Sequence, residues 1–268
     1  MPKKLKLIFS FTFPAKIWNL LIDQRAAVLY LELRDEEKQQ ASFAAYALKG
    51  HQLLWEGQCF EENWWIGMSA ADAGGLVMHT YDSSENPEEK SFFVLDSHSQ
   101  QVVWQAPAFQ VLGIHGSILF GFSKKEGSAH YQRIALGTQQ QQSLSPQELE
   151  ELLAIVSAEN KYIRRPFHYT EDDTYFSTVS RFVQNYLNLK PRLVCEYLEY
   201  GPHMFISYYV DEDQALANYL LVINQEGDLR LHEKLDDHLP NPGLGTFMCV
   251  HDQLIFIKQK RALLSYAI

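Results

Sequence analysis

Short apolar segments alternate with polar turns along most of the chain, and the pattern repeats. The segment Val28 to Glu56 aligns without gaps on the segment Val77 to Gln105, at an offset of 49 residues. Each copy has an apolar strand, a charged loop, a second strand that opens on Phe, a tight turn and a short strand that ends in Trp. This order predicts two antiparallel β-meanders built on the same plan.

Weaker copies of the same unit follow, and the last one is truncated. Units of this length with four strands are typical of β-propeller blades. We therefore predict a fold dominated by β-strands, namely a β-propeller of about five blades. The alternative is a propeller of six or seven irregular blades. The predicted blades are residues 14–60, 61–107, 108–144, 192–236 and 245–268.

Residues 145–191 interrupt the repeat and predict an α-helical insertion. Ser145-Pro146-Gln147-Glu148 has the form of a capping box with proline at the first helical position, so a helix should begin there. A second helix is predicted from apolar residues at helical spacing, and Lys190-Pro191 ends it. Its apolar face comprises Tyr175, Phe176, Val179, Phe182, Val183, Tyr186 and Leu187. A face this wide needs a partner, and we expect the helices to pack on the propeller.

The N-terminal strand Leu5 to Phe13 has no hairpin partner before it, while the last predicted blade has only three strands. We expect this strand to pair into the last blade and close the ring, because closure removes exposed strand edges. Residues 1–268 are thus predicted as one propeller domain. The N-terminus is not a secretion signal, because Pro14 and Lys16 interrupt its apolar run and no small-residue cleavage site follows.

Two kinds of segment resemble known families. The strand ends LLWE (53–56) and VVWQ (102–105), each after a tight turn, resemble the outer strands of WD and quinoprotein-like propeller blades. The segments EYLEYGPHMFISYY and NYLLVINQEGD, together with the order blades, helical insert, blades, resemble an uncharacterised bacterial family of unknown function. These resemblances imply a propeller fold and supply no activity.

The net charge and the cysteine positions argue against several kinds of partner and site. With 23 Lys plus Arg against 33 Asp plus Glu, the net charge of −10 argues against nucleic acid or an anionic membrane as partner. Cys59, Cys195 and Cys249 are far apart and form no CxxC pair, so neither disulfides nor a zinc site is predicted. No apolar stretch approaches the roughly 20 residues that span a bilayer, and we expect a soluble, cytoplasmic protein.

Tryptophans and one histidine are the first candidates for ligand binding. Trp55 and Trp104 occupy equivalent positions of the repeat, which favours structural wedges between blades over a ligand-stacking pair. Trp64 and Trp65 are adjacent on a predicted strand, so one should lie in the core and the other should face solvent, a neighbouring blade or a ligand. His115, in the segment GIHGS, ends a predicted inner strand at the expected mouth of the propeller channel, where it could bind or act as a base.

The segment 161–173 holds the highest density of ionisable side chains. Arg164 and Arg165 could hold an anion, while His168 and the following acids could coordinate a cation or move protons. A structural role explains the acids more simply, because they precede the second helix and Asp172 could cap it. For the arginines the structural alternative is docking of the insert on the acidic body.

The absence of catalytic motifs decides the predicted function. The sequence has no Walker loop, GxGxxG, HExxH or Gly-x-Ser-x-Gly elbow, and His79 is explained as a satisfied core or interface histidine. We therefore predict a non-enzymatic binding or scaffolding propeller for an unidentified protein or small ligand, without catalytic residues, cofactor or metal. The alternative is a hydrolase or lyase acting on a small or carbohydrate-like substrate at the channel mouth, although only Asp23 and Asp72 end inner strands there.

Overall fold

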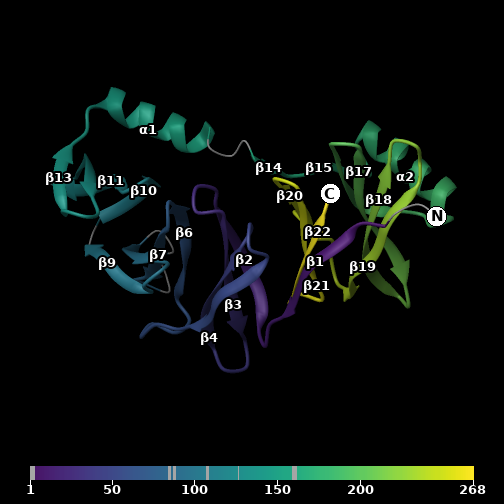
Figure 1. Cartoon of the computed structure of the whole chain (residues 1–268), viewed down its shortest axis with the longest axis horizontal. Coiled ribbons are helices and arrows are strands. Elements are labelled where there is room, and N and C mark those ends of the chain that lie inside the picture. Colours follow the sequence, from purple (N-terminus) through teal and green to yellow (C-terminus); the bar gives the residue numbers. More distant parts are fainter. Residues whose placement is uncertain (1–3, 84–85, 87–88, 107–108, 126, 159–161) are drawn as a thin grey trace. The chain divides into compact units, whose positions relative to one another are not determined.

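The chain folds mainly into β-strands. The computed structural model describes residues 4–83, 86, 89–106, 109–125, 127–158 and 162–268. Strands make up 60% of these residues and helices 11%, and the strands pair into several antiparallel sheets (Figure 1). The prediction of a β-dominated fold is confirmed.

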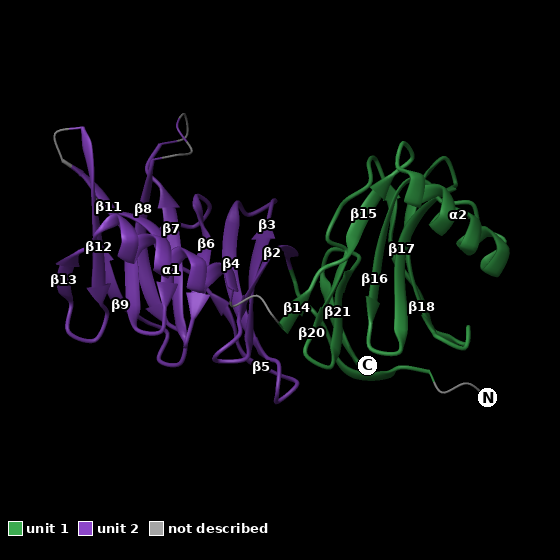
Figure 2. Cartoon of the chain, turned by 90° about the horizontal axis from the view of Figure 1, so that it is seen from above, with its two compact units in different colours: residues 1–14, 162–268 green, residues 15–161 purple. Residues whose placement is uncertain are grey.

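Two compact units divide the chain, and Figure 2 colours them separately. Residues 15–161 form the unit that we call the three-sheet unit. Its sheets are β2 (Lys16–Asp23), β3 (Val28–Asp35), β4 (Gln40–Ala47) and β5 (Gln52–Gln58); β6 (Ile66–Asp72), β7 (Gly75–Tyr81), β8 (Lys90–Asp96) and β9 (Gln101–Ala106); and β10 (Phe109–His115), β11 (Ile118–Lys125), β12 (Ser128–Ala135) and β13 (Gln140–Ser143). Each of the first three predicted blades thus forms one sheet whose strands pair in sequence order. Helix α1 (Pro146–Ala158) follows the third sheet.

Residues 1–14 and 162–268 form the second unit, which we call the two-sheet unit. One sheet has the order β15 (Phe167–Thr170), β16 (Arg192–Tyr200), β17 (His203–Glu212), β18 (Ala215–Asn224) and β19 (Leu229–Leu239). The other has the order β1 (Lys6–Thr12), β22 (Ala262–Ala267), β21 (Gln253–Lys258), β20 (Phe247–Val250) and β14 (Ile163–Arg164). Helix α2 (Thr174–Leu187) belongs to this unit.

The first and last strands of the chain pair with each other. Strand β1 runs antiparallel to β22, from Lys6 opposite Ala267 to Thr12 opposite Ala262. This is the partner that the sequence predicted for the N-terminal strand. Neither the number of blades nor the closure of the sheets into one ring is confirmed.

The predicted insertion differs from the observed structure between its two helices. Ile163 pairs with Val250 and Phe167 pairs with Tyr197, so β14 and β15 each add an edge strand to a sheet of the two-sheet unit. Residues 145–191 are therefore not purely helical. These strands span two and four residues, which is too short for an alternating pattern to emerge from the sequence.

The helix starts are set by local polar groups. The capping box at α1 is confirmed, because the Ser145 hydroxyl lies 3.3 Å from the Glu148 backbone N–H and the Glu148 carboxylate accepts the Ser145 N–H at 2.9 Å. The predicted cap of α2 was one residue off. Asp173, not Asp172, is its N-cap, but the Asp173 carboxylate makes no hydrogen bond to the helix and instead accepts hydrogen bonds from the backbone N–H and hydroxyl of Thr170.

The apolar face of α2 packs on its own unit. Phe176, Val179 and Val183 are buried in a core cluster with Ile206 and Tyr208 of β17. Other members of the predicted face stay in contact with solvent: Tyr175 is 65% exposed and Tyr186 is 37% exposed. The expectation that the apolar face is buried on the sheets is confirmed for its central residues.

Core clusters join neighbouring sheets of the three-sheet unit. One contains Tyr30 of β3 with Met78 of β7, and another contains Val94 of β8 with Leu119 of β11. Trp104 is buried in the second cluster. Trp55 packs against the first cluster, and its indole N–H donates a hydrogen bond to the Ser97 carbonyl at 2.8 Å, across to the second sheet. The wedge role predicted for both tryptophans is confirmed.

Candidate functional site

Carboxylates at the ends of equivalent strands connect consecutive sheets of the three-sheet unit. Asp23 ends β2, is fully buried, and accepts a hydrogen bond from the Gly74 N–H at 2.7 Å. Asp72 ends β6, is 3% exposed, and accepts one from the Gly116 N–H. The two aspartates are 49 residues apart, which is the offset of the sequence repeat. Each carboxylate therefore holds the first turn of the next sheet.

His115 ends β10, the first strand of the third sheet, and its side chain lies near Asp72. Its Nδ1 is 2.9 Å from Nη2 of Arg25 and 3.9 Å from a carboxylate oxygen of Asp72. Arg25 Nε lies 3.3 Å from the other Asp72 oxygen. Because a guanidinium can only donate, the His115 nitrogen that faces Arg25 accepts the bond. We call Arg25, Asp72 and His115 the strand-end cluster.

Trp64 and Trp65 lie just before β6, not within a strand as predicted. The Arg34 guanidinium lies 5.1 Å from the centre of the Trp64 ring and donates hydrogen bonds to the carbonyls of Trp64 and Ile66. The Glu32 carboxylate pairs with Arg34 at 2.6 Å, so Trp64 covers a largely buried ion pair. Trp65 is 49% exposed and touches the ring of Tyr81 edge-on, at 6.2 Å between centroids.

The basic candidates of the two-sheet unit lie on short edge strands. Arg164 is in β14, Arg165 follows it, and His168 is in β15 opposite Glu196. All three side chains are exposed. The described residues place no acidic side chain in an ion pair with them, and Lys161, the first residue of that predicted segment, lies outside the described residues.

The acids that follow these residues hold the local backbone. The Glu171 carboxylate accepts a hydrogen bond from the Leu193 N–H at 2.8 Å and lies 3.5 Å from Arg192 Nε. Asp173 is bonded to Thr170, as described above. These contacts give Glu171 and Asp173 a structural role that differs from the predicted one, because neither carboxylate caps α2 by a hydrogen bond.

The part of the chain that the structure describes shows no side chains arranged for metal binding or thiol chemistry. Within that part no three His, Cys, Asp or Glu side chains gather so as to hold a metal ion. Cys59 is an exposed free thiol, whereas burial raises the pKa of Cys195 and of Cys249 to about 12. The two buried thiols therefore stay protonated and unreactive near neutral pH. Neither α1 nor α2, the helices of the described residues, is long and apolar enough to cross a membrane.

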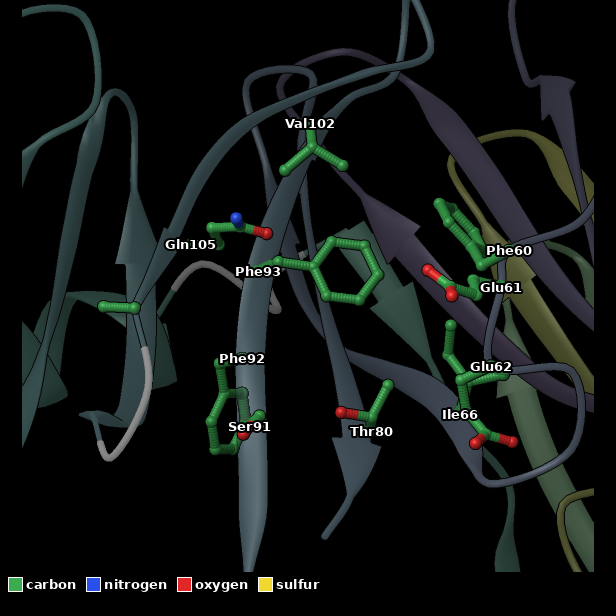
Figure 3. A pocket seen from close by; sticks show the side chains of 11 residues that line it. Phe60, Glu61, Glu62, Ile66, Thr80, Ser91, Phe92, Phe93, Val102 and Gln105 are labelled. Atoms are coloured by element: carbon green, nitrogen blue, oxygen red, sulfur yellow. The ribbon is translucent and has the colours of Figure 1, made fainter.

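A pocket of about 650 Å³ opens in the three-sheet unit, beside the connection from β5 to β6 (Figure 3). We call it the aromatic pocket. Its lining comes from that connection and from β6, β7, β8 and β9 of the second sheet. The lining residues are Phe60, Glu61, Glu62, Ile66, Thr80, Ser91, Phe92, Phe93, Val102, Gln105 and Ala106.

Packing and hydrogen bonds fix the walls of the aromatic pocket. The Phe60 ring contacts the rings of Phe43 and Phe93 at 5.8 and 5.3 Å between centroids, in edge-to-face geometry. Phe60 and Phe93 both pack against the core cluster between the first and second sheets. On the connection, the Glu62 carboxylate accepts the backbone N–H groups of the two residues at positions 64 and 65, at 2.9 and 2.8 Å. The pocket is therefore preformed by the fold.

Sequence reasoning missed the main residues of this pocket. The candidates Trp64 and Trp65 follow Glu61 and Glu62 in the chain, and neither tryptophan belongs to the lining. Phe60 and Phe93 gave no separate signal, because aromatic residues on strands usually belong to a core. Whether Trp64 or Trp65 contacts a ligand stays a prediction.

His79 is buried beside Gly67, at 7% exposure. Its Nδ1 is 2.7 Å from the Ser69 hydroxyl, while its Nε2 has no hydrogen-bond partner among the described residues. The sequence predicted that hydrogen bonds satisfy this histidine, and the structure gives a partner to one of its two ring nitrogens. Burial lowers the pKa of His79 to about 4, and the nearby charges of Lys90 and Arg34 act in the same direction.

This buried histidine should make stability depend on pH. The folded pKa lies below the ordinary value of 6.5, so the unfolded chain takes up the proton first as pH falls. Between about pH 7.5 and about pH 5 the free energy of unfolding should drop by about 2 kcal/mol through this residue alone. Urea unfolding of wild type and His79→Gln at both pH values measures the difference. The exposed His98→Gln variant should keep the wild-type dependence, and an equal drop in His79→Gln would contradict the assignment.

Comparison with known proteins gives a family match for part of the chain. Residues 22–104 match the family described as a domain of unknown function (DUF4905). The match spans less than a third of the chain and fits the resemblance to an uncharacterised family. No curated protein matches the chain.

Solved structures similar to the chain include β-propeller proteins at low identity. A DUF4221 family member from Bacteroides vulgatus has 8% identity and a TM-score of 0.37, with 100% of this chain and 98% of that chain covered. The β-propeller domain of the trilobed protease from Pyrococcus furiosus has 7% identity and a TM-score of 0.31, with 92% and 64% covered. The apo AtxE2 isopeptidase has 10% identity and a TM-score of 0.41, and this chain spans 49% of its length with 95% of itself covered. Similarities this distant say nothing about activity or ligand.

Proposed function

We propose that this protein binds a small ligand in the aromatic pocket and does not convert it chemically. The lining carries the proposal, because phenyl rings and aliphatic side chains line an open space of about 650 Å³ together with the polar side chains of Glu61, Glu62, Thr80, Ser91 and Gln105. Small-ligand sites are commonly concave, of about 300–1,000 Å³, and mostly apolar with a few placed polar groups.

The polar groups of the lining support binding over catalysis. The Ser91 hydroxyl donates a hydrogen bond to the Asp82 carboxylate at 3.0 Å, and Glu62 is bonded to the backbone of its own loop. Among the residues of the lining that the structure describes there is no histidine, lysine, arginine or cysteine. Within this described lining, no hydroxyl is therefore paired with a base of the kind that nucleophilic catalysis requires.

A hydrolase or lyase at the strand-end cluster is the second candidate function. The approach of His115 to Asp72 is the observation that favours it, since an acid–histidine pair is a common catalytic arrangement. The Asp72 carboxylate is already bonded to the Gly116 N–H and lies against Arg25, which supports a structural role. We therefore place the function in the aromatic pocket, with a small ligand as partner and neither nucleic acid nor an anionic membrane.

Blocking the pocket should abolish ligand binding without unfolding the protein. Val102 lines the pocket and is 47% exposed, so Val102→Trp should fill the opening while leaving the core intact. We expect compounds from a library of small organic cations, anions, sugars and neutral molecules to bind wild type and to lose at least about tenfold affinity in this variant. Ligand-observed NMR measures binding, and thermal melting checks the fold.

Trp65→Ala is the matched control, because it changes an exposed aromatic side chain outside the lining. It should keep wild-type affinities. Compounds that bind Val102→Trp normally and lose affinity in Trp65→Ala would move the site to the tryptophan. An Asp72→Asn variant that loses a measurable hydrolytic activity of the wild type would favour the strand-end cluster.

A further inference from the structure

We propose that the ligand of the aromatic pocket is an organic cation, an ammonium group carried on an apolar body. This inference rests on the proposed function and names the class of molecule that the pocket accepts. Three properties of the lining lead to it: the sign of its charges, the direction of one carboxylate and the position of two phenyl rings.

The ionisable side chains among the described residues of the lining are acidic. They are Glu61 and Glu62, and those described lining residues include no basic side chain to neutralise them. The chain as a whole carries a net charge of −10, which adds a long-range attraction for cations and a repulsion for anions. An anionic ligand would have to lose its hydration next to two carboxylates, so the pocket disfavours it.

The two carboxylates have different roles. Glu62 is tied to the backbone of positions 64 and 65, and Figure 3 shows its carboxylate turned away from the phenyl rings. The Glu61 side chain has no hydrogen bond or ion pair with another described residue, and Figure 3 shows its carboxylate directed toward the space beside Phe60 and Phe93. Glu61 is thus the group available to pair with a charge inside the pocket.

The rings beside Glu61 suit an ammonium group with carbon substituents. Phe60 and Phe93 lie 5.3 Å apart with planes at 61°, so they present differently oriented aromatic surfaces to the pocket. Aromatic faces attract cations through their quadrupole and also accept methyl and methylene groups, which is how quaternary ammonium ligands are recognised. One free carboxylate and two phenyl rings cannot complete the oxygen shell of a Ca²⁺ or Mg²⁺ ion.

A matched pair of probes tests the class of ligand. Choline carries a quaternary ammonium, and 3,3-dimethyl-1-butanol has the same shape without the charge. By calorimetric titration, wild type should bind choline at least about tenfold more tightly than the neutral alcohol, because only choline gains from the carboxylate and the ring quadrupoles. Glu61→Gln should remove most of this preference while leaving the weak binding of the alcohol unchanged.

The control is Glu56→Gln, which makes the same change of charge at an exposed residue outside the lining and should leave choline affinity unchanged. Equal affinity for both probes, or choline affinity unaffected by Glu61→Gln, overturns the cation proposal. If Val102→Trp still abolishes binding of both probes, the pocket remains the ligand site. Failure of choline to bind, with neutral library compounds bound in the pocket, also overturns the cation proposal alone. Failure of every compound to bind in the pocket overturns the proposed function as well.

Discussion

Replacing Gly121 with alanine is expected to destabilise the three-sheet unit by about 3 kcal/mol or more, because β10 and β11 leave no space for a side chain there. A Cβ at position 121 would overlap the backbone carbonyl oxygen of Gln110 and approach the Phe109 ring to 2.8 Å. A backbone atom held in a sheet cannot move aside as a flexible side chain could. The pairing of β10 with β11 shifts register between Val111 and Gly113, close to this contact.

Urea unfolding followed by circular dichroism measures the effect, with Gly137→Ala as the matched control. A Cβ at position 137 would have no described atom within 4 Å, and Gly137 has no positive φ, so its alanine variant should unfold within about 0.5 kcal/mol of wild type. If Gly121→Ala were as stable as Gly137→Ala, that result would contradict the close approach of the β10 backbone to Gly121.

Replacing Glu196 with alanine should lower the free energy of unfolding by about 3 kcal/mol. Glu196 lies in β16 and is 2% exposed. Its carboxylate accepts hydrogen bonds from the Gly245 N–H, from the Thr246 N–H at 2.9 Å and from the Thr246 hydroxyl. The variant removes the acceptor of all three bonds and leaves a cavity beneath the segment that leads into β20.

The exposed Glu226, in the turn between β18 and β19, provides the comparison. Glu226→Ala changes the net charge equally and should have little effect on stability. Glu196→Gln keeps one acceptor oxygen and should lose less than the alanine variant. Similar unfolding midpoints for Glu196→Ala and Glu226→Ala would show that the buried carboxylate does not hold the next strand.

Hydrophobic patterning predicted where the sheets of the three-sheet unit begin and end. The repeat at Val28 to Glu56 and Val77 to Gln105 lies within the first two sheets of the three-sheet unit, and each meander pairs strands in sequence order. This succeeds because alternation and turn residues are local properties of the chain. The capping box at Ser145 was predictable for the same reason, since all of its partners lie within one turn of helix.

Edge strands and the second helix cap were less predictable. Strands β14 and β15 are too short to show a period, and their pairing with β20 and β16 depends on how the unit folds. Asp172 and Asp173 are equivalent in the sequence as caps. Backbone conformation decides between them: Asp173 has extended φ and ψ immediately before the helix.

The candidate sites were also predictable only in part. Sequence reasoning singled out His115 as the end of a predicted inner strand between two glycines, and it noted Asp23 and Asp72 as the acids that end other inner strands. It did not find Arg25, which reaches Asp72 and His115 from the turn after β2. It also did not indicate Phe60 and Phe93, the aromatic residues that line the pocket beside Glu61.

By itself the sequence determined the β-rich fold class, the limits of the sheets in the three-sheet unit, the start of α1 and the acidic net charge. Those properties follow from periodicity, local hydrogen bonding and the count of charges. Only the tertiary structure decided that the sheets divide between two compact units and that Phe60 and Phe93 meet beside Glu61. The physical reason is that a pocket is made by side chains from different strands, and their approach is set by packing between sheets, which no local pattern encodes.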